Sequence, residues 1–202
     1  MFPTPAGSYY AISKNDSEPA RKLLNKLLRQ TETPMLTMDK ICTWSETKTN
    51  DAASELLKHM QSLGWIQAVM TIQKAPKGVL EDILPSLLKP LSAEGKILLA
   101  EAEGLCLSAQ GFDPDTADEL AALSAHLALL VDKHQDLLSR NLHLNNGALA
   151  LVDAAGNRQI GFWPMHIGIN RFVLVIGGLP HLNQPALTQL IWALSIRYAQ
   201  DS

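Results

Sequence analysis

The 202-residue sequence contains two cysteines, few aromatic residues (5%) and little charge (18%). Cys42 and Cys106 lie 64 positions apart, so they suggest neither a disulfide framework nor a paired metal-ligand motif, and we expect a reducing, cytoplasmic setting. No apolar run approaches the ~20 residues that a membrane-spanning helix needs. The opening residues lack the basic stretch and apolar run of a secretory signal. We therefore expect a cytoplasmic protein with no membrane partner.

What the sequence does contain is typical of a globular protein. Apolar residues make up 47% of the chain, too many for a disordered segment. The net charge of −3 argues against a general binder of nucleic acids or anionic membranes. Charge is uneven: residues 1–77 hold ten Lys/Arg and seven Asp/Glu, whereas residues 78–202 hold seven and thirteen. The two parts therefore differ in electrostatic character.

The change in charge coincides with a Pro- and Gly-containing segment, Lys74–Gly78, which discourages a continuous helix or strand. We place a domain boundary there. The sequence thus predicts a flexible lead-in (1–17), a first domain (18–75) and a second domain (76–202).

The first domain is predicted to contain three helices and a short strand. The expected helices begin at Pro19, at Met38 after a Thr cap, and at Asn50, and the segment Trp65–Ile72 has a strand-like composition. This order, with a polar turn before the third helix and "LGWI" after it, resembles a winged helix-turn-helix domain. The resemblance implies that the third helix, Asn50–Ser62, would be the recognition helix.

The second domain is predicted to follow the order αββαβββα. The expected elements are helix 79–91, strands 96–102 and 105–109, a helix from Asp113 to about Ser139, strands 147–153, 158–163 and 170–177, and helix 185–200. The segments "ILLAEAEGLCLSAQGF", "DPDTADELAALSAHLALLV" and "RFVLVIGG" resemble the roadblock (dynein light-chain type, profilin-like) family. The resemblance implies an α+β fold with a mostly antiparallel five-stranded sheet.

The long helix is predicted to have apolar side chains on two opposed faces. At 100° per residue, large side chains such as Leu120, Leu127 and Val131 share one face, which we expect to pack on the sheet. The opposite face carries small residues that would let a second backbone approach closely. The alternative is that alanine occurs there only because it is a good helix former on an exposed surface.

The strand that follows this helix, Gly147–Asp153, is almost continuously apolar and would be an aggregation hazard as an unpaired edge. Pairing with the same strand of a second copy would remove the hazard, so we expect a homodimer. The resemblance to roadblock domains implies the same arrangement, because those domains dimerise through their second helix and third strand. The expected interface residues are Ala121, Ala122, Ala125, Ala128, Leu129, Ala148, Leu149, Ala150 and Leu151.

Motifs for catalysis are missing. The six histidines form no HExxH pattern, Cys106 alternates within an apolar strand, and the sequence has no GxSxG, GxxxxGK[ST] or GxGxxG motif. We therefore expect no enzymatic activity, metal or cofactor. A ligand-sensing profilin-like domain is a further hypothesis, but no clustered polar groups stand out in its favour.

Two functional hypotheses remain. The roadblock resemblance implies a dimeric adaptor that scaffolds or regulates a Ras-like small GTPase. The alternative is a DNA-binding transcriptional regulator dimerised through its second domain. The residues available for nucleic-acid contact are Lys48, Asn50, Lys58 and His59. The start of the recognition helix carries Asp51 and no arginine, so the sequence favours the adaptor.

Overall fold

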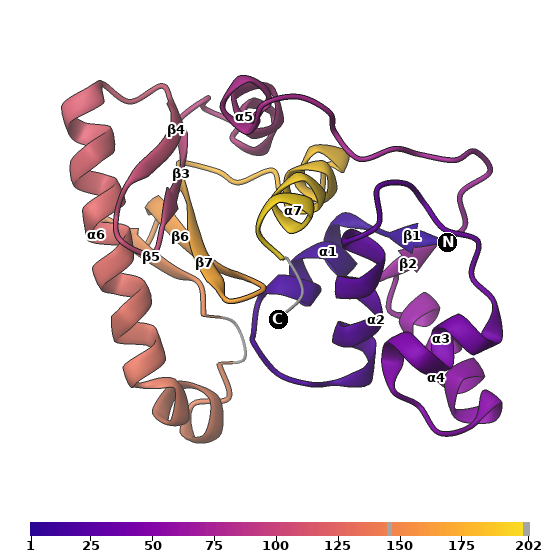
Figure 1. Cartoon of the computed structure of the whole chain (residues 1–202). Coiled ribbons are helices and arrows are strands. Elements are labelled where there is room, and N and C mark those ends of the chain that lie inside the picture. The colour runs from indigo at the N-terminus through magenta and orange to yellow at the C-terminus, as the bar shows by residue number, and fades with distance from the viewer. Residues whose placement is uncertain (145–146, 200–202) are drawn as a thin grey trace.

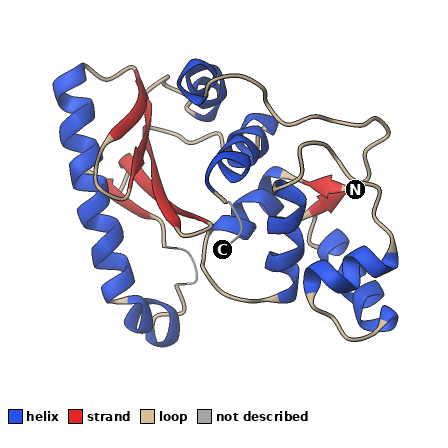
Figure 2. Cartoon of the chain, in the orientation of Figure 1, coloured by secondary structure: helices blue, strands red, loops and turns tan. Residues whose placement is uncertain are grey.

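The computed structural model describes residues 1–144 and 147–199, in which helices surround a central sheet (Figures 1 and 2). The elements of the first part are β1 (Phe2–Pro3), α1 (Pro5–Ile12), α2 (Pro19–Leu28), α3 (Met38–Ser45), α4 (Asn50–Ser62) and β2 (Ile66–Gln67). Those of the second part are α5 (Leu80–Leu88), β3 (Ile97–Glu101), β4 (Cys106–Gln110), α6 (Pro114–Lys133), β5 (Leu149–Val152), β6 (Arg158–Ile167), β7 (Asn170–Gly177) and α7 (Pro185–Tyr198). The chain is therefore α+β, as the sequence predicts.

The second part is built on a five-stranded sheet in the order β4-β3-β7-β6-β5. Every neighbouring pair is antiparallel, so the sheet is wholly rather than mostly antiparallel. The long central strands β6 and β7 pair from Ile160↔Gly177 to Ile167↔Asn170. β4 and β5 form the two edges of this sheet.

Alternating side chains send the strands' apolar residues into two separate clusters. On one face, Leu98, Phe162 and Val173 contact α6. On the other face, Leu99 and Leu174 belong to a larger cluster that includes residues of α5, α7 and the N-terminal helices. Figure 1 shows the same arrangement, with α6 on one side of the sheet and α5 and α7 on the other.

The N-terminal segment is ordered structure, which corrects the prediction of a flexible lead-in. Thr4 caps α1 by accepting a hydrogen bond from Gly7 N at 3.1 Å, and Pro5 occupies the first helical turn, where its missing N–H costs nothing. Phe2 is buried against Trp192 of α7, with ring centroids 4.3 Å apart. The Pro-rich composition suggested a loop, but here a proline begins a helix whose burial depends on residues far along the chain.

The three helices of the predicted first domain lie where the sequence indicates. Thr37 and Thr49 cap α3 and α4 by accepting bonds from backbone N–H groups at 3.3 and 3.2 Å. The strand-like segment is shorter than predicted, because only Ile66 and Gln67 pair, with Pro3 and Phe2. β1 is two residues long, so it offers no partner to the rest of the predicted strand.

The boundary at residue 76 stays a prediction, but the parts on either side share one apolar cluster. That cluster joins Leu23 and Leu27 of α2 to Leu190 and Trp192 of α7. Trp192 Nε1 also donates a 2.6 Å hydrogen bond to the carbonyl oxygen of Gln30. We therefore expect the two parts to unfold together.

Several elements of the second part differ in length from their predictions, α6 and β6 among them. α6 ends at Lys133, and a short π-helical turn, Leu137–Asn141, follows it. β6 extends to Ile167 although Pro164 lacks a backbone N–H. Among the described residues, β5 pairs only with residues 158–162 of β6, so this proline lies beyond the shared ladder and interrupts no bond to β5.

Candidate functional site

The small-residue face of α6 packs on the subunit's own sheet, which corrects the predicted orientation of this helix. Ala121 and Ala128 are buried and contact the cluster of Phe162 and Val173. Ala125 is also buried within the single chain. These three residues cannot lie in an interface with a second copy, because their own subunit already covers them. Ala122, by contrast, is exposed.

The inward orientation of the small residues of α6 has a steric cause. The sheet face beneath α6 carries bulky side chains, and small residues on the helix let its backbone approach them closely. Ala117 and Ser124, which are also buried, continue the same stripe, and Ser124 satisfies its hydroxyl by donating to Ala121 O at 2.7 Å. A stripe of small residues that includes a serine is therefore the sequence signal for the inward face. Of the larger residues that were expected there, Val131 is buried and Leu120 and Leu127 are half-buried, whereas Leu123 and Leu130 are exposed.

The outward face of α6 carries a leucine stripe, defined as Leu120, Leu123, Leu127 and Leu130. These residues span about 80° of the helix surface at 100° per residue. Leu123 is 38% exposed and Leu130 is 52% exposed in the single chain. Leu120 and Leu127 are half-buried at the margin of the cluster beneath the helix. The stripe is thus an apolar surface that its own subunit covers only in part.

β5 adds a second apolar surface at the edge of the sheet. Leu149 and Leu151 pair with Phe162 and Ile160, so their side chains lie on the face that α6 covers. Leu151 is 51% exposed and Val152 is 58% exposed. Within the described part of the chain the outer edge of β5 has no strand partner. An open strand edge and exposed leucines therefore occur on the same side of the subunit.

The remaining predicted interface residues are distributed over the same region. Ala150 is exposed on β5, whereas Ala148 is half-buried just before the strand begins. Leu129 is 57% exposed, but it lies about 100° around the helix from Leu130 and so outside the leucine stripe. The candidate site is accordingly the leucine stripe together with β5. The predicted interface shares β5 with this site, whereas its residues Ala121, Ala125 and Ala128 on α6 are buried in their own subunit.

The residues predicted for nucleic-acid contact are all exposed: Lys48, Asn50, Lys58 and His59. Asn50 and His59 lie on opposite sides of α4, about 180° apart around the helix. Asn50 Oδ1 accepts a hydrogen bond from Cys42 Sγ at 3.3 Å. These side chains do not converge on one surface.

Carboxylates further weaken this helix as a surface for phosphates. Asp51 and Glu55 are exposed on α4, and Glu55 lies three residues before Lys58 and four before His59. Side chains at these spacings are neighbours on a helix. The negative charge of Glu55 therefore offsets the positive charge that a phosphate would need.

Nothing in the described part of the chain assembles a metal site: residues 1–144 and 147–199 contain no group of three or more His, Cys, Asp or Glu side chains placed to hold an ion. Burial raises the pKa of the Cys106 thiol, and the carboxylate of Asp118 raises it further, so the reactive thiolate is disfavoured. None of the described helices is long and apolar enough to cross a bilayer.

No protein-family model matches the chain, and no curated protein matches it. Among solved structures, the chain is similar to the crystal structure of the Roadblock/LC7 domain from Streptomyces avermitilis. The two are 18% identical, the match covers 59% of this chain and 93% of that domain, and the TM-score is 0.37.

Proposed function

We propose that the chain is a homodimeric protein-interaction module whose two copies join through the leucine stripe and β5. The observation that carries the proposal is the combination of half-exposed leucines on α6 with an apolar edge strand, β5, whose Leu149 and Leu151 lie on the sheet face that α6 covers. Either feature alone is common on protein surfaces. Together they match what a symmetric interface requires, since a two-fold axis places each surface against its own copy.

Pairing of two β5 strands would use the open backbone groups of both edges. An exposed apolar edge strand is a template for unwanted pairing, and native proteins usually blunt it with charge, proline or a covering element. β5 has the sequence LALV, with neither charge nor proline, and its pairing with β6 shifts register between Leu151 and Val152. Antiparallel pairing across the axis would extend the sheet from one subunit into the next and bring the two leucine stripes together.

We further propose that the joined surface serves as a platform for a protein partner, and that a Ras-like small GTPase is that partner. This part of the proposal is supported by the resemblance of the second part of the sequence to roadblock domains. The expected absence of catalytic activity is consistent with an adaptor role. A DNA-binding function has weaker support, because carboxylates and basic residues alternate on the exposed surface of α4.

Sedimentation velocity over a range of protein concentrations tests the first part. The proposal predicts a species of twice the chain mass of 22.1 kDa at micromolar concentration. A monomer at every concentration would refute it. Affinity capture from native lysate, with small GTPases identified by mass spectrometry in the GDP- and GTP-loaded states, tests the second part. Retention on duplex DNA that falls steeply with salt would instead favour the transcriptional regulator.

A further inference from the structure

A cavity with both polar and apolar lining lies between the C-terminal half of α6, the paired ends of β6 and β7, and the loop after α1. It has a volume of about 270 Å³ and is lined by Lys14, Asp132, Gln135, His166 and Arg171, among others. An adjoining cavity of about 340 Å³ shares His166 and Arg171 with it. We call the first of these the Arg171 cavity. It lies beneath α6, on the side of the helix away from the leucine stripe.

Arg171 is the central group of this cavity. Its side chain is 25% exposed, and its Nη2 atom forms an ion pair with Asp132 of α6. Its Nε atom is buried and has no hydrogen-bond partner among the residues that the structure describes. A buried guanidinium N–H without an acceptor is costly, and the planar donor fork of arginine suits the two oxygens of a carboxylate or phosphate group.

His166 lies directly across the strand pair from Arg171, so both side chains project from the same face of the sheet. Burial lowers the pKa of His166, and the positive charge of Arg171 lowers it further, while Asp132 acts in the opposite direction and Arg21 adds a smaller lowering effect. The imidazole is therefore mainly neutral at neutral pH. A bound anion would favour its protonated form, because the added negative charge offsets Arg171.

The third positive group reaches the cavity from the other end of the chain. Lys14 lies in the loop after α1 and is half-buried. Arg21 of α2 holds this loop in place, since Nε of Arg21 donates to Asp16 Oδ1 at 2.7 Å and its guanidinium also donates to the carbonyl oxygen of Tyr10. Arg21 Nη1 also lies 3.4 Å from Ser13 Oγ, at the limit of a hydrogen bond.

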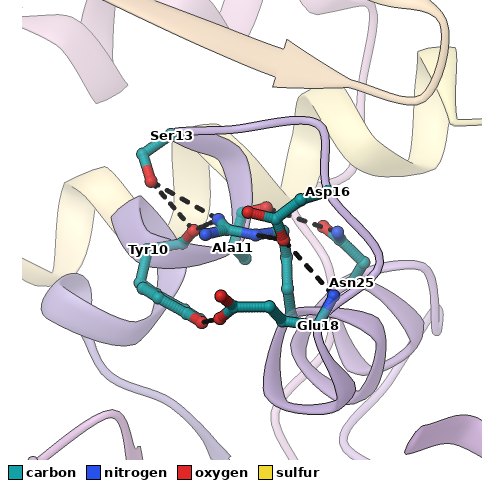
Figure 3. A network of polar contacts seen from close by, with 7 residues as sticks. Tyr10, Ala11, Ser13, Asp16, Glu18 and Asn25 are labelled. Atoms are coloured by element: carbon teal, nitrogen blue, oxygen red, sulfur yellow. Dashed lines mark hydrogen bonds and ion pairs between the residues drawn. The ribbon is translucent and has the colours of Figure 1, made fainter. Parts of the chain in front are cut away.

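Figure 3 shows the same network, in which the side chain of Glu18 reaches the hydroxyl group of Tyr10 and those of Ser13 and Asp16 lie on the other side of it. Asn25 supports it from α2 by donating to the carbonyl oxygen of Ala11 at 3.3 Å. The position of Lys14 beside the sheet is therefore set by contacts that lie outside the cavity.

The balance of charge favours an anion in the Arg171 cavity. Lys14 and Arg171 face a single carboxylate there, that of Asp132. The adjoining cavity is different, because Glu101 and Glu103 line it. An anion would consequently be held at the Lys14 end and repelled from the Glu101 end.

We propose that the Arg171 cavity binds the oxyanion group, carboxylate or phosphate, of a small molecule. Arg171 attracts the oxyanion through its guanidinium group, Lys14 supplies a second positive charge, and His166 donates a hydrogen bond. The volume is at the lower end of the range for small-molecule sites, so the ligand contains few heavy atoms beyond the oxyanion itself. The proposal does not depend on dimer formation.

Titration of the full chain with inorganic phosphate and, separately, with acetate and succinate tests the proposal, with chloride at equal ionic strength as the reference. NMR spectra of the histidine rings and calorimetry report binding. We expect saturable binding at about millimolar concentration for at least one probe, a rise in the pKa of His166 on binding, and tighter binding at about pH 6 than at about pH 7.5. Comparing phosphate with the two carboxylates shows whether the cavity binds a phosphate group or a carboxylate group.

Lys14→Gln should weaken binding by about threefold, and Arg171→Lys by about tenfold, because lysine keeps the charge but loses the donor fork. Within the part of the chain that the structure describes, Lys14 forms no ion pair or side-chain hydrogen bond, so this variant should fold normally even if a change at Arg171 disturbs the ion pair with Asp132. Arg140→Gln, at a 78% exposed position outside the cavity, is the matched control and should bind like the unaltered chain. The proposal would be overturned if no probe caused a saturable shift of the His166 signals. It would also be overturned if Lys14→Gln and Arg171→Lys bound the probes as tightly as the unaltered chain does.

Discussion

Replacing Leu130 with Glu should separate the proposed dimer while leaving each subunit folded. Leu130 lies in the leucine stripe and is 52% exposed in the single chain, so the subunit loses little internal packing when this side chain changes. Glutamate is also a good helix former, which keeps the local cost in α6 small. The effect of the substitution should therefore be confined to the interface.

The magnitude follows from the exposed fraction. Complete burial of a leucine contributes ~2 kcal/mol, so covering the remaining half of Leu130 contributes ~1 kcal/mol in each copy. Both copies of a two-fold dimer carry the substitution, so this loss occurs twice. Burying each new carboxylate beside the equivalent carboxylate of the other copy adds a further cost. A total of at least ~3 kcal/mol raises the dissociation constant by at least ~100-fold.

Sedimentation equilibrium at several protein concentrations measures this constant, and far-UV circular dichroism checks that the helix content is unchanged. Leu179→Glu is the matched control, because Leu179 is 59% exposed but lies in the loop after β7, away from the leucine stripe. We expect the control to dimerise like the unaltered chain. A Leu130→Glu protein with an unchanged dissociation constant, or a control that dissociates equally, would refute the reasoning.

Three further predictions concern stability. Gly7→Ala should destabilise the fold by ~3 kcal/mol in urea denaturation, because the added Cβ would lie 1.9 Å from the carbonyl oxygen of Trp65; a loss below ~0.5 kcal/mol would contradict the close packing of α1. Trp192→Phe should lower the free energy of unfolding by ~2 kcal/mol, because it removes the hydrogen bond to Gln30. Fluorescence and circular dichroism should still report one coincident unfolding transition, and two separate transitions would show that the two parts fold independently. Folding lowers the pKa of His166, so the unfolded chain binds the proton more readily, and the free energy of unfolding should fall as the pH drops below about 6.5. His166→Gln should make the free energy of unfolding depend less steeply on pH in this range. An unchanged slope would exclude His166 as the source of the pH dependence.

The sequence was sufficient to predict most elements of the second part because their signals are local. Asp113 and Pro114 begin α6 as a capping residue and a first-turn proline, and Glu103–Gly104 marks the turn between β3 and β4. The mostly antiparallel five-stranded sheet was implied by the resemblance to roadblock domains. What this reasoning could not supply was the non-local choice of which face of α6 points inward.

That choice depends on the shape of the sheet surface, which the helix sequence does not contain. Both faces of α6 are apolar, so hydrophobicity alone does not separate them, and Ala121 packs inward because Phe162 and Val173 already fill the space beneath it. The Arg171 cavity was missed for a related reason. Lys14 and Arg171 are 157 positions apart, and only the folded chain brings them to one cavity.

The packing of α1 and α2 against α7 has a consequence for geometry beyond the single chain. Because Trp192 bonds directly to the segment after α2, the N-terminal helices have little freedom to swivel about the linker near residue 76. Two subunits joined at β5 would present their α4 helices at one fixed spacing and angle. A partner that contacts both would have to match that separation, so the distance between its own contact points becomes a criterion for recognising it.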